Sequence, residues 1–200
     1  MYFIYMSTLY TIGHSTHPVQ KLVDLLSMHR VSAVADVRSS PYSSYNPQFN
    51  SEPLQLALRA ADIEYVFLGR ELGARPADRR CYMDGQVQFG LLAQSEFFCA
   101  GLERLRTGME SYTITLLCAE KDPIACHRMI LVCRSLRSGG MKIQHILEDG
   151  ALEDNTGAER RLMRELHIQD NDLFASDEEL ILRAYDIQGK KIAYMEKTDE

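Results

Sequence analysis

Long hydrophobic runs are missing from this sequence of 200 residues. No stretch approaches the roughly 18 consecutive apolar residues that mark a membrane-spanning helix, so no membrane partner is expected. The apolar opening MYFIYMSTLYTIGH lacks a basic segment and a small-residue cleavage site. It is therefore expected to form a first strand and not a signal peptide. Together these absences predict a cytoplasmic protein.

A disulfide framework is lacking as well. The five cysteines are an odd number without the regular spacing of disulfide-rich proteins, which suits a reducing compartment. Excess positive charge is also absent, because the net charge is −6. Of 28 acidic and 22 basic residues, 15 and 7 lie in residues 148–200, leaving 13 and 15 for residues 1–147. Bulk charge therefore does not imply a nucleic-acid partner.

The near-neutral part of the chain does contain one basic cluster. Four arginines lie close together there: Arg70, Arg75, Arg79 and Arg80. A solvated loop is the simpler interpretation of such a cluster, because short basic runs are weak indicators of function. An anionic small molecule or a nucleic acid nevertheless stays open as a partner.

A regular alternation of strand and helix patterns is present along the chain. Short apolar or β-branched runs predict five strands, at residues 9–13, 31–37, 63–68, 113–118 and 141–147. Apolar residues at helical spacing predict helices at residues 19–30, 51–61, 89–105, 126–136 and 158–166. This alternation is typical of a single α/β domain, here with a mainly parallel five-stranded sheet and helices on both faces.

The remaining segments are expected to be loops and a tail. Residues 69–88 show no clear periodicity and contain glycine and proline, so they are expected to form a long loop. We assign residues 1–167 to the α/β domain and residues 168–200 to an acidic C-terminal extension, with a helix at residues 177–187. No linker rich in Pro, Gly or Ser separates the extension, which is therefore expected to pack on the core.

The stretch TITLLCAEKDPIACHRMILVCRSL, residues 113–136, concentrates chemically reactive side chains. An apolar strand pattern ends at its first cysteine, and a helical pattern begins near its second. The connection holds two thiols, a carboxylate, an imidazole and a guanidinium: Cys118, Glu120, Cys126, His127 and Arg128. Either cysteine alone has an equally good interpretation as a small buried hydrophobic residue. The five groups together favour a reactive or ligand-binding site.

Other polar residues directly follow predicted strands. His14 and Ser15 come after the first strand, Asp36 and Arg38 after the second, and His145 lies in the fifth. Because parallel strands end at one edge of a sheet, where such folds hold ligands, we expect these groups to share one cleft with Cys118. The alternatives are an Asp36–Arg38 ion pair and a hydrogen-bonded core role for His145.

A set of short motifs resembles a known family. The motifs are TIGHS (11–15), DVR (36–38) followed by SPYSSYNPQF, LGRELGA (68–74), LLCAE (116–120), CHR (126–128) and the QHI around His145. In this order they resemble the family called domain of unknown function 488, over roughly residues 8–167. The resemblance implies an α/β domain that shares these polar residues, and it implies no established reaction.

A weaker analogy links the chain to rhodanese-like sulfurtransferases, which also have a DVR-like turn and a cysteine at the end of an apolar strand. By topology, Cys118 would stand at the catalytic position. The loop AEKDPIA carries Glu120 and Asp122, whereas a loop that binds an anion or a persulfide needs glycines and free backbone N–H groups. The likeness therefore does not transfer the function.

The first functional hypothesis is an enzyme or ligand-binding protein for a nucleotide, nucleobase or nucleic acid. The expected catalytic groups are His14, Asp36, Cys118 and Glu120. Arg38 and Arg128 would bind phosphate, and the rings of the long loop after the second strand would stack on a base. The full expected binding set is Ser15, Arg38, Tyr42, Tyr45, Phe49, Cys126, His127, Arg128 and His145. In the opposing view, Asp36 and Glu120 pair with the two arginines.

The alternative hypothesis is a thiol-redox or metal-binding protein that uses Cys118, Cys126, His127 and His14. The spacing Cys-x7-Cys-His is not a standard zinc spacing, so no metal ligand is assigned from the sequence. A binding module without turnover is a third possibility. The sequence names no cofactor, and it leaves open the reaction, the oligomeric state and the role of the acidic tail.

Overall fold

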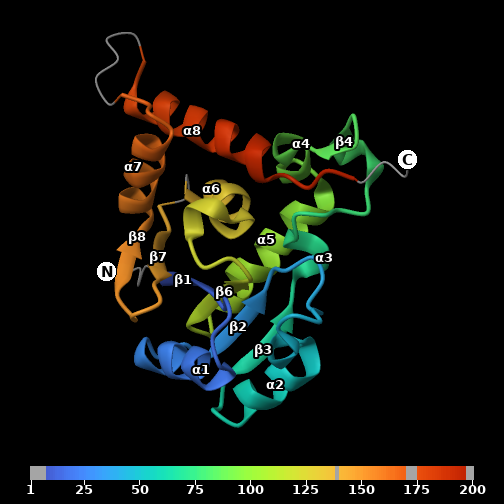
Figure 1. Cartoon of the computed structure of the whole chain (residues 1–200), viewed down its shortest axis with the longest axis vertical. Coiled ribbons are helices and arrows are strands. Elements are labelled where there is room, and N and C mark those ends of the chain that lie inside the picture. The colour runs from blue at the N-terminus through green and yellow to red at the C-terminus, as the bar shows by residue number, and fades with distance from the viewer. Residues whose placement is uncertain (1–7, 138–139, 170–174, 197–200) are drawn as a thin grey trace.

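A six-stranded, mainly parallel sheet forms the centre of the computed structural model, which describes residues 8–137, 140–169 and 175–196 (Figure 1). The strand order is β3-β2-β6-β1-β7-β8, and only the β7–β8 pair is antiparallel. The strands are β1 (Thr8–Gly13), β2 (Ala33–Asp36), β3 (Glu64–Phe67), β6 (Ile114–Cys118), β7 (Lys142–Ile146) and β8 (Leu152–Asp154). The α/β class and the mainly parallel sheet are thus confirmed.

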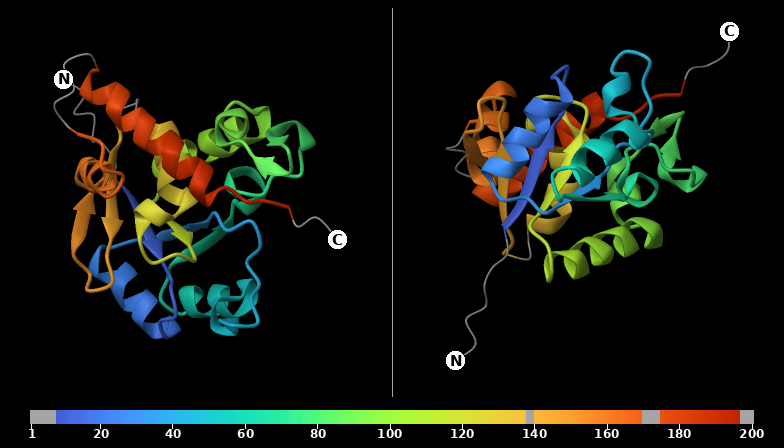
Figure 2. Two further views of the ribbon diagram at one scale, coloured as in Figure 1. Left: turned by 45° about the horizontal axis from the view of Figure 1, so that its top comes forward. Right: turned by 90° about the horizontal axis from the view of Figure 1, so that it is seen from below.

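Helices cover both faces of the sheet (Figures 1 and 2). On one face, α1 (Val19–Met28) and α2 (Ser51–Arg59) bury leucines against Ile12 and Leu117. The core on the other face is built with α3 (Gly69–Leu72), α4 (Phe89–Ala93), α5 (Glu96–Met109), the π-helix η4 (Arg128–Cys133), α6 (Arg134–Leu136), α7 (Asn155–Glu165) and α8 (Asp177–Ile192). Short 3-10 turns lie at η1 (Pro47–Phe49), η2 (Arg79–Cys81) and η3 (Pro123–Ala125).

The central strand β6 explains how the site is positioned. All five residues of ITLLC are buried, as expected for a strand with helices on both sides. Its neighbours run parallel to it, and Gly13 of β1 pairs with Cys118, while Asp36 of β2 pairs with Leu117. The carboxyl ends of three adjacent strands therefore meet at one edge, where the polar residues that follow them come together.

Three details differ from the sequence-based expectation. The sheet has six strands and not five, because the short segment Leu152–Asp154 adds an antiparallel edge strand. The expected loop at residues 69–88 contains α3 and a hairpin of β4 (Tyr82–Met83) and β5 (Gln86–Val87). The expected helix at residues 89–105 is two helices, because Ser95 caps α5 by accepting a hydrogen bond from Phe98 N.

Residues that follow β8 and α7 join the domain through α8, which packs on α7, η3 and η4. Leu180, Ala184 and Tyr185 are buried in the larger core, and Gln188 donates to the Ile124 carbonyl at 2.8 Å. Beyond α8, the Tyr194 carbonyl accepts a hydrogen bond from Val87 N at 3.0 Å. This contact places the end of the described chain beside the β4–β5 hairpin (Figure 2). Within the described residues, no helix is long and apolar enough to cross a membrane.

Candidate metal centre and adjoining pocket

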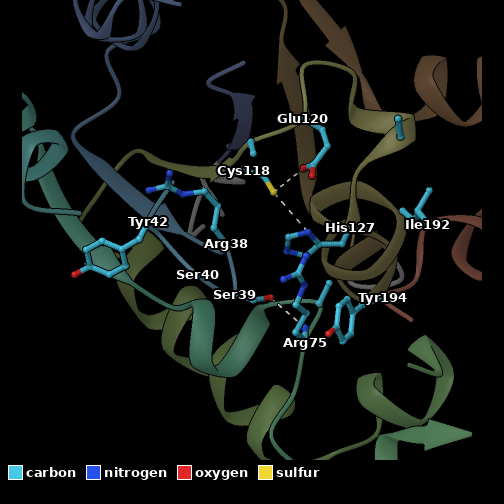
Figure 3. Close-up of a pocket in the computed structure, with 13 residues that line it drawn as sticks. Arg38, Ser39, Ser40, Tyr42, Arg75, Cys118, Glu120, His127, Ile192 and Tyr194 are labelled. Atoms are coloured by element: carbon cyan, nitrogen blue, oxygen red, sulfur yellow. Dashed lines mark hydrogen bonds between the residues drawn. The ribbon is translucent and has the colours of Figure 1, made fainter. Parts of the chain in front are cut away.

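Four possible metal ligands converge where β6 ends and η4 begins. They are Cys118, Glu120, Cys126 and His127, and their donor atoms all lie within 4.8 Å of one another. Both thiols lie 2.9 Å from Oε2 of Glu120, and Cys118 Sγ lies 3.5 Å from Nδ1 of His127. Figure 3 shows Glu120 and His127 approaching the Cys118 sulfur from two sides. Two thiols, an imidazole and a carboxylate form a donor set that suits zinc.

The loop that carries this cluster is fixed by local chemistry. Asp122 caps the η3 turn by accepting from Ile124 N at 3.1 Å, and Pro123 occupies its first position. Arg161 of α7 holds the Asp122 carboxylate with two contacts of 2.8 Å. Gly13 lets the loop cross β1 closely, because a Cβ there would lie 1.8 Å from the Glu120 carbonyl oxygen. The sequence between Cys118 and Cys126 is thus held in one conformation from several sides.

His127 is oriented as a metal ligand. Its Nε2 lies 2.9 Å from the Val37 carbonyl oxygen, which can only accept a hydrogen bond, so Nε2 carries the proton when the ring is neutral. Nδ1 then holds the lone pair and points toward the Cys118 sulfur. Metal-bound histidines commonly donate their second ring N–H to a carbonyl or carboxylate in this way.

The two thiols of the cluster differ in acidity. Burial, together with the nearby Cys126 sulfur and the Glu120 carboxylate, raises the pKa of Cys118 well above its ordinary value. Burial alone would raise the pKa of Cys126, but the hydrogen bond from Cys118, the charge of Arg128 and His127 outweigh it and lower this pKa well below the ordinary value. The Arg128 backbone N–H also donates to Cys126 Sγ at 3.4 Å. These opposite directions make Cys126 the more acidic thiol of the pair.

Burial of its carboxylate in this cluster raises the pKa of Glu120. The adjacent Cys126 sulfur acts in the same direction, because a nearby negative charge disfavours a second one. The thiols, the imidazole and the carboxylate therefore form one set of coupled protons. A bound divalent cation would displace protons from this set, since thiolate, neutral imidazole and carboxylate are the binding forms.

An unusual helix follows the cluster directly. Residues 128–133 form a π-helix, which then continues into α6. Extended π-helix is rare and occurs mostly as single turns at functional sites. Here the π-helix begins at Arg128, directly after the two possible ligands Cys126 and His127.

Arg128 plays a different part from the one expected. Its side chain is fully buried, with Nη1 donating to the Glu120 carbonyl at 2.5 Å and Nη2 to the Lys121 carbonyl at 2.9 Å. Its Nε donates to Thr11 Oγ1 at 3.3 Å. Arg128, expected to bind phosphate, is thus absent from the lining of the pocket described below, and the expected pairing with the Glu120 carboxylate is also absent among the described residues. Arg128 instead fixes the backbone of the loop that carries Glu120.

A second polar cluster lies at the same sheet edge, on the side of α1 and α2. Asp36 is fully buried and binds Arg38 through three contacts of 2.5 to 3.2 Å, so the proposed ion pair between them exists. Asp36 also accepts from Tyr65 OH at 2.8 Å. His14 Nδ1 lies 2.8 Å from the Ser15 carbonyl, so Nδ1 carries the proton, and Nε2 accepts from Arg38 at 3.2 Å. Burial lowers the pKa of His14 to about 4, which keeps the ring neutral.

The other predicted residues divide into buried and exposed groups. Phe49 is fully buried and stacks on His14 at a centroid distance of 4.2 Å, so the expectation that it stacks on a bound base is wrong. His145 is fully buried and hydrogen-bonded to Thr11 and Asn155, and it contributes nothing to the cleft expected to hold it. Tyr42 and Tyr45 are exposed. Ser15 adopts a positive φ of 49° and ties β1 to the Ala119 carbonyl through its N–H.

A cavity of about 400 Å³ opens in front of the four-donor cluster. Cys118, Glu120 and His127 line it on one side. The polar and aromatic part of the remaining wall comes from distant segments: Arg38, Ser39, Ser40, Tyr42, Arg75 and Tyr194. Arg75 and Tyr194 were not singled out as site residues from the sequence. The basic cluster that contains Arg75 favours a solvated loop and leaves an anionic partner open, and no local pattern marks Tyr194.

The fold and the site define an α/β protein with a thiol–imidazole–carboxylate cluster at the carboxyl edge of its sheet, beside a pocket lined by arginine and serine. The chain belongs to the family described as domain of unknown function DUF488, whose model matches residues 18–134. This confirms the resemblance read from the sequence motifs. No curated protein and no solved structure matches the chain.

Proposed function

We propose that the protein is a metal-dependent enzyme with a catalytic zinc centre formed by Cys118, Cys126, His127 and Glu120. The observation that supports this most strongly is the convergence of four donors of the right chemical types within 4.8 Å. Two thiolates and an imidazole favour zinc over the hard cations calcium and magnesium. The hydrogen bond from His127 Nε2 to the Val37 carbonyl holds the imidazole in the orientation that such a ligand needs.

The spacing of the donors is close to that of a tetrahedral site. Zinc–sulfur and zinc–nitrogen bonds of about 2.3 and 2.1 Å place ligating S and N atoms about 3.6 Å apart. Cys118 Sγ and His127 Nδ1 are 3.5 Å apart, so they need almost no movement. The sulfur–oxygen separations of 2.9 Å would have to open by roughly 0.6 Å to reach the same geometry.

The position of the cluster favours catalysis over a structural role. Structural zinc sites are closed, whereas catalytic sites keep one position for water or substrate. Three of the four donor residues line the pocket, so a metal here could be reached by a substrate. Cys126, the fourth, is almost fully buried behind them.

Glu120 is the ligand best suited to exchange with water. It is the one exposed residue of the four, although its carboxylate is turned into the cluster. A carboxylate that water displaces from the metal can take up and return a proton. Bound zinc would supply a water molecule that ionises near neutral pH. In the hydrolytic reaction that we propose, the water oxygen bonds to an electrophilic atom of an anionic substrate, and the bond to the leaving group breaks. Glu120 accepts the water proton and delivers it to the leaving group.

A dithiol redox function is the second candidate. It is supported by the two sulfurs that share one carboxylate oxygen and by the opposite directions of their pKa shifts. A low-pKa thiolate beside a second thiol is the arrangement that supports disulfide exchange. Oxidation by a disulfide such as oxidised glutathione would form a Cys118–Cys126 bond and release two molecules of the reduced thiol.

Elemental analysis of protein purified without chelator separates the two candidates. We expect one zinc per chain, lost in Cys118→Ser and retained in the control Cys133→Ala, which changes a buried thiol at the end of η4, outside the cluster. A protein that takes up no zinc even after incubation with the ion would contradict the metal proposal. Peptide mapping that finds a Cys118–Cys126 disulfide in such zinc-free protein, after oxidised glutathione treatment, would favour the redox alternative.

A further inference from the structure

We infer that the pocket beside the four-donor cluster binds the phosphate group of a small phosphorylated substrate, of about nucleotide size, with Arg75 as its principal cation. This inference rests on the proposed function in one respect, since it assigns a substrate to the same pocket. It is argued from Arg75 and Tyr194 and not from the four metal donors, so it can be tested separately from the zinc proposal.

Of the two arginines that line the pocket, Arg38 is already bound to Asp36, which leaves Arg75 for a ligand. Two neighbouring arginines are occupied, because Arg79 pairs with Glu196 and Arg80 with Asp78. Among the described residues, no carboxylate forms an ion pair with Arg75. Its guanidinium instead lies 4.4 Å from the ring centroid of Tyr194, a contact that holds a cation without neutralising its charge.

Tyr194, just after the end of α8, keeps Arg75 at the pocket. Tyr194 lines the same cavity, and its carbonyl is anchored to the hairpin by the Val87 N–H at 3.0 Å. Figure 3 shows Tyr194 beside Arg75, on the side of the pocket opposite Tyr42. Tyr194 lies outside residues 18–134, which the family model matches. The part of the pocket wall formed by Tyr194 therefore comes from a segment that the family model does not match.

Hydroxyl donors surround the arginine. Ser39 Oγ accepts the Arg75 backbone N–H at 3.1 Å, so its own hydrogen is free to be donated. Ser40 is exposed and lines the cavity as well. Arg38 retains N–H groups beyond those given to Asp36 and His14. Several donors around one site match a tetrahedral oxyanion such as phosphate, and an arginine adds a charge-assisted bond.

The dimensions favour a small molecule. A cavity of about 400 Å³ falls in the range of small-molecule pockets, and the exposed ring of Tyr42 at its rim could stack on a base or another planar group. A second cavity shares Ser39 and Arg75 with this pocket, but it places Glu71, Asp78 and Glu96 among its arginines. That mixture of charges disfavours the phosphate backbone of a polynucleotide.

Calorimetric titration with inorganic phosphate and with AMP tests the inference. We expect both to bind the wild-type protein, and Arg75→Met to weaken binding of each at least about tenfold, the usual effect of losing one charge-assisted hydrogen bond. The matched control is Arg79→Met, an arginine of the same loop whose partner is Glu196. This variant should bind within about twofold of wild type. The thermal unfolding of both variants is recorded to show that they are folded.

The titrations are run on zinc-loaded protein and on the zinc-free protein obtained with a chelator. Binding that depends on Arg75 in either form supports the inference, even if the metal analysis fails, so the two proposals can fail separately. Wild-type protein that binds neither phosphate nor AMP in both forms would overturn it. Equal affinities for folded Arg75→Met and wild type would overturn it as well. A short oligonucleotide that binds while AMP and phosphate do not would replace the small molecule with a nucleic acid.

Discussion

Replacing Gly13 with alanine tests how closely the site loop depends on the sheet. A Cβ at this position would lie 1.8 Å from the Glu120 carbonyl oxygen and 3.1 Å from Arg128 Nη1. The loop must therefore retreat by more than about 1 Å to restore van der Waals contact. That movement also breaks the 2.5 Å hydrogen bond by which Arg128 holds Glu120.

The expected cost of Gly13→Ala has two parts. Overpacking a filled site costs about 1 to 3 kcal/mol, and weakening a buried hydrogen bond to a charged group costs about 1.5 to 3 kcal/mol. We expect the free energy of unfolding in urea to fall by about 3 to 5 kcal/mol on this basis. Zinc affinity, measured against a chelating dye, should fall about 10- to 100-fold, as it does when support for metal ligands is lost.

Gly90→Ala is the matched control. Gly90 lies in α4, and a Cβ there meets nothing within 4 Å. Alanine at this position should stabilise the protein by up to about 1 kcal/mol, because glycine loses more backbone entropy in a helix. If Gly13→Ala retained wild-type stability and zinc affinity, the packing of the loop against β1 would not hold the site together.

Three further perturbations follow from the buried polar groups. Burial lowers the pKa of both His14 and His145 to about 4, below the ordinary 6.5. As the pH falls, the two histidines therefore bind protons in the unfolded chain before they do so in the folded protein. The free energy of unfolding should accordingly be highest above pH 6.5 and fall towards pH 4. The loss of unfolding free energy is about 2 to 3 kcal/mol per histidine. His145→Gln should therefore make the free energy of urea unfolding less dependent on pH. An unchanged pH dependence would refute the role given to His145. Arg128→Met should destabilise the protein by about 3 to 5 kcal/mol in the same assay, because one buried and two partly buried acceptors lose their donor. A change below about 1 kcal/mol would argue against its structural role. Tyr65→Phe should cost about 1 to 3 kcal/mol by removing a hydrogen bond to the buried Asp36 carboxylate, and unchanged unfolding would show that the bond is dispensable.

The sequence was informative where the chemistry is local. The strand pattern of residues 113–118 and the turn that follows place Cys118, Glu120, Cys126 and His127 within ten residues of one another. Parallel pairing of β1, β2 and β6 then brings His14 and Asp36 to the same edge. Alternating strands and helices are enough to predict that edge.

The direction of individual side chains could not be predicted. Arg128 turns toward backbone carbonyls and not toward the pocket, and Phe49 packs into the core although it lies in a polar loop. The role of Arg75 depends on Tyr194, which is more than a hundred residues away in the chain. Such contacts are set by tertiary packing, of which the sequence pattern holds no local trace.

X-ray absorption at the zinc edge of the purified protein tests the central claim most directly. We predict one zinc per chain with two sulfur ligands at about 2.3 Å and nitrogen and oxygen ligands at about 2.0 to 2.2 Å. In Cys118→Ser protein incubated with excess zinc, any bound zinc should have one sulfur ligand. A zinc shell without sulfur in the wild-type protein, or failure to bind zinc after incubation with the ion, would contradict the metal centre.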